Sequence, residues 1–242
     1  MIPHIIHYCW FGRQTKPKVI IDYIEGWKKL LPDYQFMEWN EDNFPIDFCK
    51  YTEEAYNLKK YAFVSDVARL YALFNFGGVY LDTDVELIKR FDEYLDKAKM
   101  IFSMESKTLL MTGFMAGEKE CSVFKILLSE YKQRNFVNAD GSLNCVANTV
   151  YLTNLMKKYG LIFEKNEQII RENIHIYGHE IFGAFNVDTS TYDVTDKTVL
   201  IHHCFASWKS KSSRLGHSLR IWLAKNTGGL YERIRQFKNS RR

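Results

Sequence analysis

Apolar residues recur along this chain with two alternating periods. Residues 62–76 show the three-to-four-residue spacing of a helix, whereas residues 4–10 and 79–81 form short apolar runs typical of buried strands. The same patterns predict further helices at 19–31, 52–60, 121–134 and 146–159, strands at 34–39, 100–103, 109–116, 174–176 and 199–203, and a connection with a short helix at 85–95. Strands that alternate with helices predict an α/β fold with crossover connections.

Composition fits one reduced globular domain. The chain has 242 residues and is 46% hydrophobic, which is enough for a sizeable core. Its five cysteines include no Cys-x-x-Cys pair, so we expect reduced thiols in a cytosolic protein. No apolar run approaches the ~20 residues that span a bilayer, and no signal peptide is evident. We therefore expect a cytoplasmic location.

The net charge of +4 is unevenly distributed. Residues 209–242 hold ten Lys or Arg and one acidic residue, whereas the rest of the chain holds 23 basic and 28 acidic residues. Apolar residues in this tail recur at helical spacing in two runs: Leu215, Leu219, Trp222 and Leu223, then Leu230, Ile234 and Phe237. We expect a catalytic domain over 1–208 and a basic amphipathic tail over 209–242, which could contact an anionic membrane surface or dock on the domain. The body shows no basic groove, so a nucleic acid partner is not expected.

Residues 77–84, Gly-Gly-Val-Tyr-Leu-Asp-Thr-Asp, carry the first sign of chemistry. Asp82 and Asp84 follow a short apolar run and would share a side-chain direction if the strand continued. Two carboxylates at a strand end suit Mn²⁺ or Mg²⁺, which keep positions for substrate phosphates. Taken alone, an Asp-x-Asp motif also fits a solvated turn.

The helix before the glycines carries a second charged pair. Asp66 and Arg69 are three residues apart and therefore lie on one helical face. A surface ion pair would explain them equally well. Because Ala62 and Leu73 share that face, we expect the pair to face protein or a cleft rather than bulk water, and sugar hydroxyls could supply some of its hydrogen bonds.

Together these residues resemble glycosyltransferase family 32, which includes bacterial capsular-polysaccharide transferases and eukaryotic initiating mannosyltransferases. The resemblance rests on Ser65-Asp66-x-x-Arg69 followed by Gly77-Gly78-x-Tyr80-Leu81-Asp82-x-Asp84. Residues 2–12 and 202–208 also resemble the family's first strand and its C-terminal metal and diphosphate segment. The resemblance implies a GT-A architecture, a Rossmann-like mixed sheet flanked by helices, with a metal and a nucleotide sugar donor.

The resemblance also implies roles on the donor side. Trp10 would stack on the nucleotide base, although a core tryptophan is the alternative, and Phe11 and Gly12 would continue that loop. Tyr80 would line the same pocket unless it belongs to the core. Ser207 and Trp208 would contact the diphosphate.

The catalytic group implied by the resemblance comprises Asp66, Arg69, Asp82 and Asp84. Asp66 and Arg69 are assigned to the donor sugar. Asp84 is the first choice for direct metal ligation, and Asp82 would contact the sugar or ribose and reach the metal through water. The metal set is completed by one histidine.

That histidine is one of two neighbours. His202 and His203 end a strand and should point to opposite faces, so only one can reach the metal. His202 is favoured by its place in the family segment.

The acceptor side is less defined. The chain has Thr112-Gly113 where relatives often have an Asn near the reacting sugar. Other residues lie where acceptor contacts could fall, although loop or cap roles explain them as well: Asp140, Asn144, Asn148 and Thr149.

The resulting prediction is a metal-dependent retaining glycosyltransferase. It would move a hexose, with a UDP-sugar favoured, to a glycan or lipid-linked glycan in cell-surface or capsular polysaccharide synthesis. The alternatives are a non-catalytic nucleotide-sugar or glycan-binding protein on the same fold, and a phosphate-ester hydrolase. A two-metal hydrolase would need a second ligand cluster, which the sequence does not show.

Overall fold

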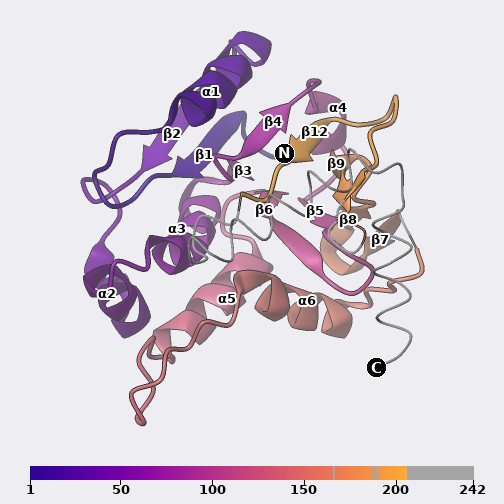
Figure 1. The fold of residues 1–242 in the computed structure, drawn as a ribbon. Helices are drawn as coiled ribbons and strands as arrows, with labels where there is room; N and C mark the ends of the chain where they lie inside the picture. The colour runs from indigo at the N-terminus through magenta and orange to yellow at the C-terminus, as the bar shows by residue number, and fades with distance from the viewer. Residues whose placement is uncertain (166, 187–188, 190, 206–242) are drawn as a thin grey trace.

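A seven-stranded mixed sheet forms the centre of the molecule (Figure 1). The computed structural model describes residues 1–165, 167–186, 189 and 191–205. The strand order is β2-β1-β3-β6-β5-β8-β7. The bounds are β1 (Ile5–Cys9), β2 (Gln35–Trp39), β3 (Gly78–Leu81), β5 (Met100–Met104), β6 (Leu110–Gly117), β7 (Gln168–Ile170) and β8 (Ile174–Tyr177). β1 pairs in parallel with β2 and β3, whereas β6 runs antiparallel to β3 and β5.

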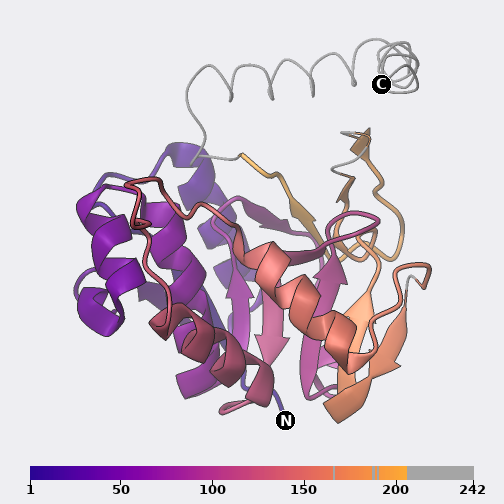
Figure 2. The same cartoon turned by 90° about the horizontal axis from the view of Figure 1, so that it is seen from below.

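Helices cover both faces of this sheet (Figures 1 and 2). On one face lie α1 (Lys18–Leu30) and α4 (Asp92–Leu95); on the other lie α2 (Lys50–Asn57), α3 (Tyr61–Phe76), α5 (Ser122–Lys132) and α6 (Asn148–Tyr159). Each face buries its own apolar cluster, one around Trp27 and Phe91 and the other around Tyr51 and Phe124. Two 3₁₀ turns, η1 (Ile46–Phe48) and η2 (Arg171–Asn173), occur in connections.

A smaller sheet begins shortly after β3 in the chain and joins residues 85–87 to residues 182–183 and 200–202. It consists of β4 (Val85–Leu87), β12 (Leu200–His202) and β9 (Phe182–Gly183), and a separate hairpin joins β10 (Phe185–Asn186) to β11 (Thr191–Tyr192). β12 runs antiparallel to β4 with His202 opposite Val85. This register brings the end of β12 beside the residues that follow β3.

Two glycines make the turn from α3 into β3. The Gly77 N–H bonds the Leu73 carbonyl, and both glycines have left-handed φ angles, +67° for Gly77 and +103° for Gly78. A Cβ on Gly78 would lie 2.6 Å from the Ile5 carbonyl oxygen. The glycine pair therefore lets α3 end and β3 begin against β1 without a gap.

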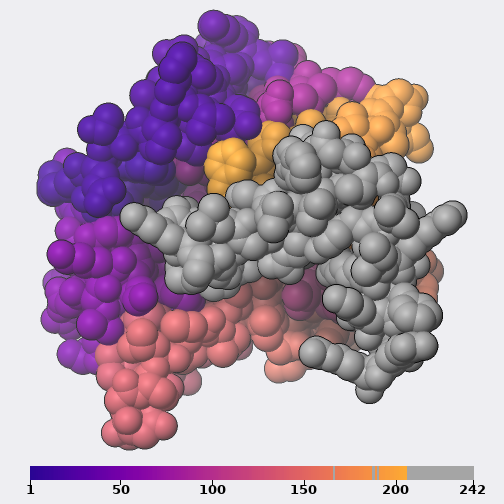
Figure 3. All heavy atoms as spheres, viewed as in Figure 1, coloured from indigo at the N-terminus to yellow at the C-terminus, as the bar shows by residue number. Residues whose placement is uncertain are grey.

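The α/β sheet predicted from the sequence is confirmed, and each predicted helix and strand is present in the described residues. The connection at 85–95 contains β4 as well as the expected helix, and β7, β9, β10 and β11 were not predicted. These strands have two or three residues each, too few to show a period. Within the described residues, none of the helices combines the length and apolar composition needed to cross a bilayer. The basic tail at 209–242 lies outside the described residues. In the space-filling view of Figure 3, the helices α5 and α6 lie at the edge of the molecule opposite the N-terminal elements.

Candidate active site

The two carboxylates of the Asp-x-Asp motif lie in a tight turn directly after β3. The strand ends at Leu81, and the Val85 N–H bonds the Asp82 carbonyl at 3.1 Å. The side-chain alternation expected for a continuing strand therefore does not apply, because the chain reverses here into β4. The Asp82 N–H still bonds the Gly113 carbonyl of β6 at 2.8 Å, which fixes the start of the turn.

His202 is the third member of this group. Its Nε2 lies 3.3 Å from Asp84 Oδ1 and 3.8 Å from Asp82 Oδ2, and ligand atoms of all three residues lie within 4.8 Å of one another. The histidine side chain is 10% exposed and the Asp84 side chain 15%. Two carboxylates and an imidazole at these separations fit one divalent cation such as Mn²⁺ or Mg²⁺.

Backbone donors from the C-terminal strand support Asp84. The Phe205 N–H donates to Asp84 Oδ2 at 2.7 Å, and the His203 N–H donates to the Asp84 carbonyl at 3.0 Å. Burial alone would raise the pKa of Asp84, but the charge and hydrogen bond of His202 and the Phe205 N–H lower it to about 2. The Asp84 carboxylate is therefore ionised throughout the ordinary pH range.

The other ring nitrogen of His202 faces sulfur. Its Nδ1 lies 3.2 Å from Met111 Sδ and 3.5 Å from Cys204 Sγ. Burial lowers the pKa of His202, but Cys204 and Asp84 raise it well above 6.5, so a proton and a cation would compete for Nε2. Gly113 of β6 makes room for the ring, since a Cβ there would lie 2.6 Å from His202 Cε1.

Asp66 and Arg69 form the predicted pair on α3, and the pair faces the motif. Arg69 Nη2 lies 3.2 Å from Asp66 Oδ1 and 3.2 Å from Asp82 Oδ1. The Arg69 side chain is 7% exposed and that of Asp66 13%. Burial raises the pKa of Asp66 to about 6, and the Arg69 charge acts against that rise. The structure thus brings Asp66, Arg69, Asp82, Asp84 and His202 together.

His203, the residue after β12, points away from this group, as predicted for neighbours at a strand end. Its Nε2 lies 2.9 Å from Glu86 Oε2, and its Nδ1 lies 3.1 Å from the Tyr192 hydroxyl. The ring also stacks on Tyr23, with centroids 5.2 Å apart. His203 is therefore held by side chains outside the carboxylate group.

The N-terminal loop residues have separate environments. Trp10 is partly exposed, donates its indole N–H to the Gln14 carbonyl at 2.6 Å and has Lys16 Nζ 5.6 Å from its ring centroid. Phe11, in contrast, is 7% exposed and packs edge-on against the core residue Phe44. Only its backbone is available to a ligand in this conformation.

Gly12 has a φ of +96°, and its N–H donates to Glu41 Oε1 at 2.6 Å. A Cβ at this position would lie 2.4 Å from Tyr61, so the loop requires glycine here. Gly12 therefore holds the loop against the start of α3.

Tyr80 is a core residue that contacts the Asp-x-Asp motif through its hydroxyl. It is 1% exposed, its hydroxyl donates to Asp82 Oδ1 at 2.8 Å, and the Arg69 guanidinium lies 4.7 Å from its ring centroid. Ser207 and Trp208, predicted to contact the diphosphate, lie outside the described residues.

The four suggested acceptor residues lie in different environments. Asp140 accepts from Ser142 in an exposed turn, whereas Thr149 accepts from Thr153 within α6. The Asn144 carbonyl accepts from Tyr51. Asn148 begins α6, is 1% exposed and donates to the Asp66 carbonyl at 3.0 Å. Of these residues, Asn148 alone contacts a residue of the carboxylate group among the described contacts.

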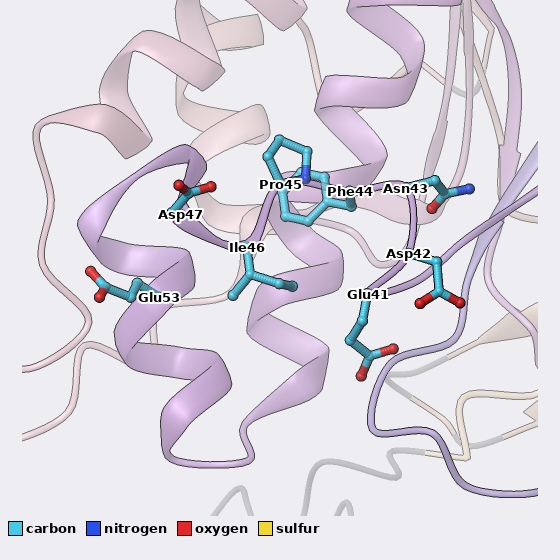
Figure 4. Close-up of a pocket in the computed structure, with 8 residues that line it drawn as sticks. All are labelled: Glu41, Asp42, Asn43, Phe44, Pro45, Ile46, Asp47 and Glu53. Atoms are coloured by element: carbon cyan, nitrogen blue, oxygen red, sulfur yellow. The ribbon is translucent and has the colours of Figure 1, made fainter.

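An open pocket of about 550 Å³ follows β2 and is separate from the carboxylate group (Figure 4). Its lining is rich in acidic side chains: Glu41, Asp42, Asn43, Phe44, Pro45, Ile46, Asp47 and Glu53. Glu41 connects it to the N-terminal loop through Gly12. The pocket contains none of the residues predicted for the site.

The sequence alone assigned no supporting role to three residues that contact the site: Thr112, Met111 and Cys204. Thr112 accepts from Arg69 through both its carbonyl oxygen and its hydroxyl. The Met111 contact with His202 and the Thr112 contact with Arg69 join residues far apart in the sequence, and no local spacing encodes them. Cys204 contacts His202 two residues before it, but its role depends on where β12 places that histidine.

The chain is similar in sequence and in fold to known glycosyltransferases. Residues 17–101 match the family model described as a glycosyltransferase sugar-binding region containing a DXD motif. The matched segment includes Asp66, Arg69, Asp82 and Asp84 but ends before β6 and β12.

The curated relatives are from Schizosaccharomyces pombe (strain 972 / ATCC 24843). Inositol phosphoceramide mannosyltransferase 3 is 28% identical over 102 residues, covering 39% of this chain and 27% of that protein. Inositol phosphoceramide mannosyltransferase 1 is 27% identical over 149 residues, covering 56% and 45%. The chain therefore spans less than half the length of these relatives.

Among solved structures, the PaToxG glycosyltransferase superposes with a TM-score of 0.51 at 17% identity, covering 65% of this chain and 68% of that one. At this identity the likeness concerns the fold. The match over residues 17–101 and the curated relatives show that the chain is similar to DXD-containing glycosyltransferases of the family 32 type, and its mixed sheet flanked by helices has the GT-A architecture.

Proposed function

We propose that this protein is a metal-dependent glycosyltransferase that moves a hexose from a nucleotide diphosphate sugar to a glycan or lipid-linked glycan. The observation that carries the proposal is the convergence of Asp82, Asp84 and His202 from two segments more than a hundred residues apart. A solvated turn would not need a buried histidine from another strand. The adjacent Asp66–Arg69 pair adds polar groups suited to a sugar.

Asp84, Asp82 and His202 would hold the cation. When bound, Mn²⁺ or Mg²⁺ would supply Lewis-acid stabilisation of the leaving diphosphate. Asp84 is ionised and braced by backbone donors, which suits a direct ligand. Asp82 has one oxygen engaged by Tyr80 and Arg69, and its other oxygen faces His202.

The remaining donor contacts follow from placement. The partly exposed Trp10 offers an aromatic face to the base, and the Gly12 backbone allows close approach of the nucleotide. Ser207 and Trp208 are proposed to contact the diphosphate. We propose retention at the anomeric carbon by a front-face path in which the departing phosphate takes the acceptor proton, because no carboxylate is assigned as a nucleophile.

The proposal extends to the donor and the acceptor. The curated relatives are named for mannosyl transfer to inositol phosphoceramide, so a mannose donor stands beside UDP-glucose and UDP-galactose. A lipid-linked acceptor would suit the basic residues at 209–242, which we propose contact anionic headgroups. Cell-surface polysaccharide synthesis is the proposed setting.

A donor panel tests the proposal. The protein would be incubated with Mn²⁺ and UDP-glucose, UDP-galactose or GDP-mannose, and both thermal shift and nucleoside diphosphate release would be recorded. We expect one donor to stabilise the chain and to release its diphosphate slowly without acceptor. Absence of binding by any donor would contradict the proposal, and binding without release or transfer would favour a non-catalytic binding protein.

Two adjacent histidines provide a matched pair of variants. His202→Gln should abolish Mn²⁺-dependent release, because the ring faces both carboxylates. His203→Gln should retain it, because that ring faces Glu86 and Tyr192. Equal effects of the two substitutions would refute the ligand assignment.

A further inference from the structure

β7 is an edge strand of the seven-stranded sheet (Figure 1). Its inner side pairs antiparallel with β8, and among the described residues no strand pairs with its outer side. The strand reads Gln-Ile-Ile, without the charged residue or proline that often keeps an edge from pairing with another chain. The opposite edge, β2, differs, because Glu38 pairs with Lys16 and Lys28 lies over the Phe36 ring. β7 is therefore the less protected of the two edges.

β7 also exposes a large apolar side chain. Ile169 is 66% exposed, more than any other described large hydrophobic residue except Met1. Its neighbour Ile170 packs on the apolar cluster that contains residues of α6, so the alternation along the strand turns Ile169 to the other face of the sheet. Ile162 is also exposed, and two hydrogen bonds with the Gln168 side chain join its backbone to β7. Two exposed isoleucines therefore lie on or beside the open edge.

Opposite charges flank Ile169 at equal distances along the chain. Glu167 precedes it by two residues, and Arg171 follows it by two. Because the chain stays extended through Ile170, with φ −115° and ψ −170°, both charged residues share the face of Ile169. Both are exposed, and neither forms a salt bridge with another described residue. The open edge thus presents an acid, an isoleucine and a base in a row.

This order is complementary to a second copy of itself. In an antiparallel pair related by a two-fold axis at Ile169, the two isoleucines lie directly opposite each other. Each Glu167 then lies opposite Arg171 of the partner subunit. Directly opposite side chains on one face of an antiparallel pair contact each other, and apolar pairs and opposite charges both stabilise the pairing. A parallel pair in the same register would instead place like charges side by side.

We propose that the outer edge of β7 binds a second copy of this chain by antiparallel β7–β7 pairing centred on Ile169. The pairing would extend the sheet across the two-fold axis and form a closed dimer. The strand is short, so we expect a weak dimer with a dissociation constant in the micromolar range. The strands β6, β5 and β8 lie between β7 and β3, and the interface does not include the Asp-x-Asp turn. The inference goes beyond the proposed function and does not depend on it.

Charge reversal tests the register. Sedimentation equilibrium of the full chain, over concentrations that span the micromolar range, measures the dissociation constant. Glu167→Arg and Arg171→Glu each place two pairs of like charges in the interface, so each should weaken the dimer at least about tenfold. An equimolar mixture of the two variants should recover the wild-type affinity, because one chain then carries only basic and the other only acidic residues at these positions. Ile169→Lys should weaken the dimer as well, and thermal unfolding verifies that each variant is folded.

Disulfide cross-linking tests the position of the two-fold axis. Ile169→Cys is made in a Cys145→Ser background, because Cys145 is itself exposed. Cα atoms directly opposite each other in an antiparallel pair are about 4.5–5.5 Å apart, a separation that a disulfide spans. We therefore expect a covalent dimer on mild oxidation. Val19→Cys in the same background is the matched control, since Val19 on α1 is 41% exposed, and it should cross-link much less.

Three results would overturn the inference. The first is a monomer at every concentration, which would leave the edge to solvent or to another segment of the chain. The second is a dimer whose dissociation constant neither Glu167→Arg nor Ile169→Lys changes, which would place the interface elsewhere. The third is a mixture of the two charge variants that associates no better than either alone, or equal cross-linking of the Ile169→Cys and Val19→Cys variants. None of these results bears on metal or nucleotide binding, so the proposed function would stand.

Discussion

Replacing Gly113 by alanine should displace His202 from the carboxylates. An added Cβ would lie 2.6 Å from His202 Cε1, 2.8 Å from Nδ1 and 3.0 Å from Nε2, all well inside ordinary contact. The ring has little room to retreat, because Met111 Sδ lies 3.2 Å from Nδ1 and β12 is paired with β4 on one side and β9 on the other. The methyl group therefore competes directly with the imidazole for one position.

The magnitude follows from this geometry. Overpacking of a buried position costs about 1–3 kcal/mol, so G113A should lower the free energy of unfolding by that amount. In a His202→Ala background the ring is absent, and the same substitution should be neutral or slightly stabilising. The two sites should therefore show a coupling energy of about 1–3 kcal/mol.

Metal binding gives the second readout. G113A should lower Mn²⁺ affinity to the level of H202A, and the double variant should show no further loss. Chemical denaturation of the wild type, G113A, H202A and the double variant measures the coupling energy. Isothermal titration with Mn²⁺ measures the affinity of each. Additive stability effects, or wild-type Mn²⁺ affinity in G113A, would refute the claim that this glycine makes the place for a metal-binding histidine.

Three further predictions concern pH and charge. Burial lowers the pKa of His7 to about 4, so as pH falls from 6.5 to 4 the unfolded chain takes up a proton that the folded one does not. The wild type should then lose about 3 kcal/mol relative to His7→Gln by denaturation, and parallel pH curves would contradict this. Burial raises the pKa of Asp66 to about 6, so as pH rises the unfolded chain releases a proton that the folded chain still holds. Wild type should lose up to about 3 kcal/mol relative to Asp66→Asn as pH rises from 4 to 7, and a gain would contradict it. The full chain should sediment with vesicles containing phosphatidylserine but not with neutral ones, and Arg233→Gln/Arg235→Gln should weaken this binding; equal binding to both vesicles would exclude the electrostatic contact.

The layered architecture could be predicted because its elements are long and periodic. The helix 62–76 was readable from its apolar spacing, and the glycine pair marked its end. The short strands β9, β10 and β11 could not be predicted, since two residues carry no period and pairing decides whether they form.

The candidate site was partly encoded locally. Asp82 and Asp84 were identified from their place after an apolar run, although they converge through a turn and not along a strand. The position of His202 depends on the β12–β4 register, which no nearby residue specifies. For the same reason the enclosure of Arg69 by Thr112 lay beyond the sequence, because it requires α3 and β6 to be in place.

Anomalous scattering from a crystal grown with Mn²⁺ and a nucleoside diphosphate tests the metal assignment directly. We expect one manganese peak bounded by Asp84, His202 and the outer oxygen of Asp82, with the diphosphate on its open side. A manganese ion bound elsewhere, or nucleotide bound while these three side chains remain paired with one another, would contradict it.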